Sequence, residues 1–252
     1  MSDGLSFWGY IPAENDSFFM ETFAFQPDMP AIDSLHHIFF TNPCLTFLYQ
    51  SFYVMFVSAK YSLVADAVFI EKEKDRLFFF CHPNDQSLKV LAQPLKSLNA
   101  SILYGIDHEI YAFLLRSLSN PQFILSLSPL IIAWIKKSRT TFPKLMHVVI
   151  NEYAMDVFCV EHGELLFVNS YNYDTQNDVI YYLMYICKQT GFNQLEDYLT
   201  LSGQKTVCRS VLSVINKYVK KTDYLQPKLT GYQVANDHDV SLDMIALLEC
   251  GL

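Results

Sequence analysis

This sequence lacks glycine-rich loops. Only 8 of its 252 residues are glycine, and the dinucleotide-binding pattern G-x-G-x-x-G does not occur. The stretch Gly203-Gln204-Lys205-Thr206 ends like a P-loop, but no glycine precedes it at the spacing that lets backbone amides surround a phosphate chain. The common glycine-based nucleotide loops are therefore excluded.

Signatures of catalysis and of metal binding are missing as well. The serine-hydrolase elbow G-x-S-x-G is absent. None of the seven histidines forms H-E-x-x-H, and the six cysteines show no paired metal-ligand spacing. We therefore predict no catalytic residue and no metal ligand, and the sequence leans against an enzyme.

Basic charge and long apolar runs are also scarce. With 18 Lys and Arg against 26 Asp and Glu, the net charge of -8 argues against a nucleic-acid partner. The longest apolar runs, 45–57 and 123–135, are about 13 residues each, whereas a spanning helix needs about 20. The first residues carry no export signal, so we expect a cytoplasmic protein without a membrane span.

Hydrophobic residues make up 51% of the chain, which excludes extended disorder. Aromatic residues reach 15%, with 20 Phe and 16 Tyr, and this density favours strand-rich layers with thick cores. The tyrosines at 181, 182 and 185 fall on one predicted helix. Without interleaved basic residues, they indicate a packing surface rather than a platform for stacked bases.

The most regular part of the sequence is residues 147–203. Its periodicity changes from strand to helix and back, in an order that limits the fold. We predict strands at 147–150, 153–160, 165–170 and 198–201, a turn at 161–164, a helix at 176–189, and a further helix over 207–218.

A weaker form of the same order opens the chain. A hairpin, a helix and a strand follow one another, but the additional leading strand of the later copy is missing. Between the copies lie a strand, a helix, a strand and a helix. The predicted elements are strands at 4–11, 18–25, 52–57, 100–106 and 122–127, and helices from Ile32 to Asn42, at 111–118, within 84–99 and at 129–137.

No flexible linker divides the chain, so we predict two lobes that share an interface. The best boundary lies between Thr140 and Pro143. The predicted division is a first lobe at 1–143, a second lobe at 144–228, and a tail at 229–252 whose apolar residues form a final helix that packs back on the body.

This repeated pattern resembles the two ribonuclease-H-like lobes of the actin-like ATPases, and among them the proteins of pilus assembly and type II secretion. It implies an α/β fold of mixed sheets flanked by helices. Several strings are similar to DUF3822, an uncharacterised family from Bacteroidetes, to which no activity is assigned. These strings are Ser2-Asp3-Gly4-Leu5-Ser6-Phe7, Asn151-Glu152, Tyr198-Leu199-Thr200-Leu201-Ser202-Gly203 and Leu247-Leu248-Glu249-Cys250.

The resemblance also implies where a nucleotide would bind. Actin-like ATPases use a tight turn after the first strand of each lobe, built around Asp and Gly. In the second lobe that turn is Asn151-Glu152-Tyr153, which contains neither, and Tyr153 is bulky where the backbone would approach the phosphates, so intact ATP hydrolysis is not expected. The candidate cofactor-binding residues are Asp3, Gly4, Asn151, Glu152, Ser202 and Gly203.

Three functions follow from these observations. The first is a non-catalytic scaffold or interaction module that binds another protein or itself, without a cofactor. The second is a nucleotide-binding protein with degenerate motifs, for which ATP and Mg²⁺ are the cofactors. The third is a small-molecule enzyme whose site is assembled from distant polar residues such as Asp107, His108 and Glu152.

Overall fold

The computed structural model describes residues 4–11, 14, 17–83, 87–140, 143–151, 154–226 and 240–250. Its internal contacts divide the chain into two units, each described by itself. Of the described residues, the first unit holds those up to Pro94, Ser101–Leu125 and Val240, and the second holds those that fall within 95–100, 126–226 and 241–250. By these contacts, the helix that precedes the predicted Thr140–Pro143 boundary belongs to the second unit.

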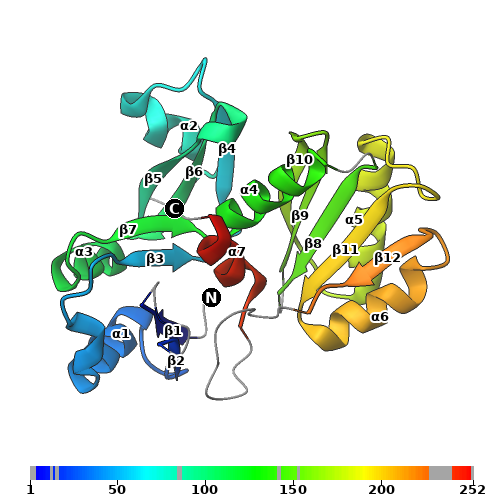
Figure 1. Ribbon diagram of the computed structural model, residues 1–252. Coiled ribbons are helices and arrows are strands. Elements are labelled where there is room, and N and C mark those ends of the chain that lie inside the picture. Colours follow the sequence, from blue (N-terminus) through cyan, green and yellow to red (C-terminus); the bar gives the residue numbers. More distant parts are fainter. Residues whose placement is uncertain are drawn as a thin grey trace. The chain divides into compact units, whose positions relative to one another are not determined.

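The second unit is built on a five-stranded sheet in the order β10-β9-β8-β11-β12 (Figure 1). β8, β9 and β10 are antiparallel neighbours, whereas β11 is parallel to β8 and β12 is parallel to β11. This is the ribonuclease-H-like arrangement that the resemblance implies, although strand β12 was not predicted from the sequence. The elements are α4 (Leu127–Ser138), β8 (Leu145–Ile150), β9 (Ala154–Glu161), β10 (Glu164–Asn172), α5 (Gln176–Gln189), β11 (Tyr198–Gly203), α6 (Lys205–Ile215), β12 (Lys221–Tyr224) and α7 (Leu242–Cys250).

Helices cover both faces of this sheet. Met146, Val148 and Ile150 of β8 belong to one buried cluster with residues of α5 and α6. The residue between the first two, His147, faces the opposite side, where it contacts Trp134 of α4. Because both faces are buried, β8 is apolar almost throughout, as is usual for the central strands of such sheets. α7 packs against α4.

The boundaries of α5 are those that the sequence predicts. Thr175 is the N-cap, and it exchanges hydrogen bonds with Asp178 in a capping box. At the other end, Gly191 has a φ of 61°, the left-handed conformation that follows many helices. Strong local signals at both ends therefore fix this helix.

The first unit contains three small sheets in its described residues. β1 and β2 form an antiparallel hairpin, β3 and β7 a parallel pair, and β4, β6 and β5 a three-stranded sheet in that order. Phe113 of α3 packs on Phe39 of α1. The elements are β1 (Gly4–Gly9), β2 (Phe19–Ala24), α1 (Ala31–Thr41), β3 (Tyr53–Phe56), β4 (Tyr61–Ala65), α2 (Lys74–Cys81), β5 (Leu88–Leu95), β6 (Ala100–Asp107), α3 (His108–Ser117) and β7 (Gln122–Leu125).

The short helix predicted within 84–99 is a single 3-10 turn at Lys96–Leu98. Most of the described part of this stretch is strand β5, which was not predicted. The cause is tertiary, because Leu88, Val90 and Ala92 alternate onto a small core with Phe78 of α2. Packing against α2 therefore selects a two-residue period in a segment whose local sequence is ambiguous.

Candidate functional site

The structure brings together three of the six candidate cofactor-binding residues. Asn151 directly follows β8, while Ser202 and Gly203 end the neighbouring parallel strand β11. Gly4 is elsewhere: it starts β1, where a side chain would meet the Phe23 carbonyl oxygen at 2.4 Å. Asp3 and Glu152 lie outside the described residues.

Asn151 has its backbone groups engaged within the protein. Its N–H donates to the carbonyl oxygen of Ala154, at 2.9 Å, which closes the turn from β8 to β9. Its carbonyl oxygen accepts a hydrogen bond from the hydroxyl of Tyr173, which is buried at 8% exposure. The described part of this turn is thus held by protein partners on both sides.

Gly203 is required by a close approach between strands. Its φ is 98°, and a Cβ atom there would lie 2.1 Å from the carbonyl oxygen of Ile150, the last residue of β8. The same oxygen accepts a hydrogen bond from the N–H of Gln204 at 2.8 Å. A glycine at this position therefore allows the end of β11 to lie directly against the end of β8. The packing of the two strands explains this glycine without any ligand.

Ser202 takes part in a buried polar cluster with His147. The imidazole Nε2 lies 2.9 Å from Ser202 Oγ, and Nδ1 lies 2.8 Å from Thr200 Oγ1. Trp134 stacks on the ring with centroids 4.7 Å apart, and the Phe158 centroid lies at 5.3 Å. All the hydrogen-bonding capacity of the imidazole is therefore used inside the protein.

This histidine–serine pair has the composition of a nucleophile and its base, but not the accessibility. His147 is 0% exposed and Ser202 is 1% exposed, so a substrate cannot reach either group. Burial lowers the pKa of His147 to about 3, and the nearby Lys137 acts in the same direction. The imidazole is neutral at physiological pH, and the cluster joins β8 to β11 rather than performing chemistry.

A site for Mg²⁺ and a triphosphate uses free backbone amides and a carboxylate near the metal. In the described part of these turns, the backbone groups of Asn151 and the hydroxyl of Ser202 have protein partners, and Gly203 lies directly against the backbone of Ile150. The N-terminus of α6, where Lys205 is the first residue, has no side-chain cap. A helix N-terminus attracts anions, but alone it does not define a ligand.

The third hypothesis, a dispersed enzyme site, is not supported by the position of Asp107. Its carboxylate caps α3 by accepting hydrogen bonds from the N–H groups of Glu109, at 2.9 Å, and Ile110, at 3.1 Å. Within the described residues, no three His, Cys, Asp or Glu side chains are close enough to hold a metal ion. Nor does the described part of the chain contain a helix long and apolar enough to cross a bilayer.

Sequence reasoning missed an apolar surface on and before helix α2 of the first unit. A pocket of about 690 Å³ opens beside α2 and the segment before it. Phe80 is 87% exposed, Val68 is 68% exposed and Ile70 is 60% exposed. We call this the α2 surface; its lining residues are Val68, Ile70, Glu73, Arg76, Leu77, Phe79 and Phe80.

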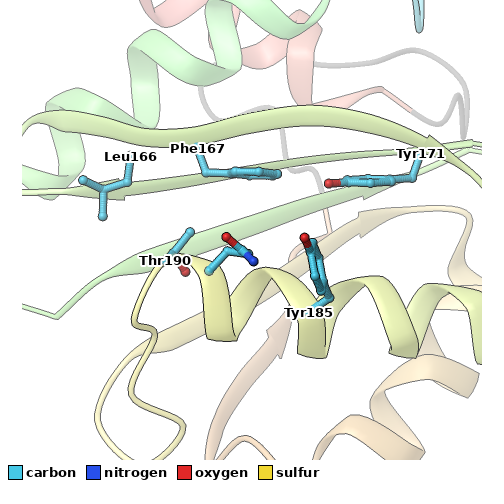
Figure 2. Close-up of a pocket in the computed structure, with 6 residues that line it drawn as sticks. Leu166, Phe167, Tyr171, Tyr185 and Thr190 are labelled. Atoms are coloured by element: carbon cyan, nitrogen blue, oxygen red, sulfur yellow. The ribbon is translucent and has the colours of Figure 1, made fainter.

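A second hollow lies in the other unit, between β10 and α5. Leu166, Phe167 and Tyr171 of β10 face Tyr185 and the end of α5 at Thr190 across it (Figure 2). Its volume is about 580 Å³. Of the α5 tyrosines, Tyr182 stacks on Tyr171 with ring centroids 4.5 Å apart, whereas Tyr181 and Tyr185 are exposed. We call this hollow the β10 groove.

The fold places the protein among those with the actin-like ATPase fold. A crystal structure from Bacteroides thetaiotaomicron VPI-5482, of a protein with this fold and unknown function, superposes with a TM-score of 0.88 at 28% identity. The match covers 99% of this chain and 93% of that one. The predicted fold class is therefore confirmed.

The particular family is DUF3822, proteins of unknown function, whose model matches residues 1–222. The chain belongs to this family, as its short strings indicate. The PilM–PilN type IV pilus biogenesis complex is also similar, with 12% identity over 85% of this chain and 82% of that one and a TM-score of 0.47. No curated protein matches the chain.

Replacing Gly203 by alanine tests its structural role. We expect Gly203→Ala to lower the free energy of unfolding by about 3 kcal/mol, because the new methyl group meets backbone that cannot move aside. Gly191→Ala is the matched control: its φ is also positive, but nothing lies within 4 Å, so about 1 kcal/mol is expected. Urea unfolding measures both, and equal losses would contradict the assignment.

The buried histidine predicts a dependence of stability on pH. The pKa of His147 is lower in the folded protein, about 3, than the ordinary 6.5, so the unfolded chain binds more protons between these values. The neutral imidazole therefore contributes fully to the free energy of unfolding above pH 6.5. This contribution is lost as the pH falls from 6.5 toward 3, by at most about 1.4 kcal/mol per pH unit.

The variant His147→Gln isolates this effect. Burial raises the pKa of Asp156 to about 6, which favours the folded state as the pH falls from 6 toward 3.8 and so opposes the histidine. Unfolding free energies of wild type and variant are therefore compared at each pH, where the Asp156 contribution cancels. Parallel pH profiles of the two proteins would show that His147 is not held neutral.

Proposed function

We propose that this protein is a non-catalytic protein-interaction module, built on an actin-like fold, and that it binds an apolar segment of another protein through the α2 surface. The observation that carries the proposal is the exposure of Val68, Ile70 and Phe80 around one pocket. An apolar cluster of this kind, left in water, is typical of an interaction site.

The chemistry of the α2 surface supports this function. Phe79 and Leu77 line the pocket and also pack against the small core around Phe78, so its floor is anchored to folded structure. At its edge, Arg76 and Glu73 form an ion pair of 3.3 Å on the helix. An apolar centre with a charged rim is the usual composition of a protein–protein interface.

Other apolar side chains of the first unit are also in water. Phe40, at the end of α1, is 87% exposed, and Leu48 in the following loop is 91% exposed. A single exposed apolar residue needs no explanation. Among the described residues, however, the first unit has more strongly exposed apolar side chains than the second unit has. They support a role for the first unit in binding.

We place this function in the cytoplasm. The five described cysteines are free, and Cys159, Cys187 and Cys208 are buried in the second unit. Burial raises the pKa of the Cys187 thiol to about 11 and those of the other two to about 12, which keeps them protonated and unreactive. Free thiols used as core residues suit a reducing compartment.

Substitutions on the α2 surface test the proposal. Tagged wild type and the double variant Ile70→Ser/Phe80→Ser are purified from the native cell, and the recovered proteins are quantified. We expect one partner to bind wild type and to fall at least tenfold with the variant, since one lost anchor residue contributes roughly 1.4 kcal/mol or more.

Leu195→Ser is the matched control, because Leu195 is 67% exposed but lies on the second unit. It should retain the partner, and urea unfolding should show that all variants fold as wild type does. Recovery of the same partner by the double variant, or of no protein above an untagged control, would exclude this surface as the binding site.

A further inference from the structure

β10 is an outer strand of the five-stranded sheet. It pairs with β9 on one side, and in the described part of the chain no strand pairs with its other side. The outward N–H and C=O groups of such a strand form a template for another strand. This edge therefore has a backbone that is ready for pairing.

The sequence of β10 does not protect this edge. Proteins commonly place lysine, other charges or proline on an open edge strand to prevent association. Residues 165–172 contain none of these, and Glu164 at the start is the strand's one charged residue. A β-bulge leaves Leu166 without a partner on β9, but from Phe167 to Asn172 the pairing is regular.

The side chains along this regular stretch are arranged for self-pairing. Phe167 and Tyr171 lie on the α5 side, opposite Cys159 and Met155 of β9, and Asn169 lies midway between them on the same side. In an antiparallel pair of two β10 strands centred on Asn169, each Phe167 would face the other copy's Tyr171. Such aromatic cross-strand pairs stabilise sheets, and no charge would face a like charge.

We propose that two copies of this chain associate through β10 in this register, with the two-fold axis passing between the two Asn169 residues. The contact is isologous, because the same strand supplies both sides, and it closes at two copies. Leu166 and Tyr185, which are 43% and 47% exposed, both line the β10 groove (Figure 2). In the proposed dimer the two β10 grooves adjoin, and these side chains lie along the new contact.

A second copy fits this edge better than an unrelated peptide does. The spacing of Phe167 and Tyr171 about Asn169 is symmetric, so each strand presents the aromatic residue that its copy requires. The one charge, Glu164, lies at the strand end, away from the centre of the pair. This proposal is independent of the α2 surface, which belongs to the first unit.

Cross-linking tests the register directly. Asn169 is exposed, and in the proposed pair the two Cα atoms are about 5 Å apart, within reach of a disulfide. Asn169→Cys should therefore give a covalent dimer with oxidised glutathione. Asn172→Cys is the matched control: it changes the same residue type on the same strand, but the two Cα atoms are about 20 Å apart. Wild type measures the background from Cys81, which is exposed.

Sedimentation velocity over a concentration series tests the association itself. Wild type should approach about 58 kDa, twice 29.1 kDa. Asn169→Lys places two ammonium groups opposite each other and should weaken the dimer at least tenfold. A wild type that stays monomeric, or a dimer that Asn169→Cys does not cross-link more than Asn172→Cys, would overturn the proposal.

Discussion

The close parallel contact between β8 and β11 is the interaction on which the second unit depends. Ile150 and Gly203 end these strands so near each other that a Cβ atom on Gly203 would meet the carbonyl oxygen of Ile150, and the N–H of Gln204 donates a hydrogen bond to the same oxygen. The elements that follow these two strands start from this contact, because helix α6 begins immediately beyond Gln204 and strand β9 begins after the turn at Asn151.

Buried polar groups strengthen the same pairing in the interior. His147, Thr200 and Ser202 satisfy one another between β8 and β11, under Trp134 of α4. A one-residue slip would move the imidazole to the face occupied by α5 and α6, where the described core is apolar, and leave the two hydroxyl groups unpaired. The cluster thus specifies the register of β8 against β11. The histidine–serine pair and Gly203, which resemble a catalytic pair and part of a nucleotide loop, both have a role in this strand pairing.

Local signals allowed most of the second unit to be predicted from the sequence. The capping box at Thr175 and the alternation in β9 are determined within a few residues, and the structure confirms the elements they indicate. The cluster of His147 with Ser202 was not predicted, because its members are 55 residues apart and meet only through strand pairing. The α2 surface was missed for a related reason: exposure of Phe80 depends on which face of α2 packs against β5, and strand β5 was not predicted from the sequence.

The central claim is that an actin-like fold persists here while the turns that would hold a nucleotide serve the structure of the sheet. Isothermal titration calorimetry of the full chain with ATP and Mg²⁺ tests it most directly. We expect no saturable heat of binding. Saturable one-to-one binding that is weakened by Lys205→Ala, at the start of α6, would contradict it and would assign the protein to the nucleotide-binding class.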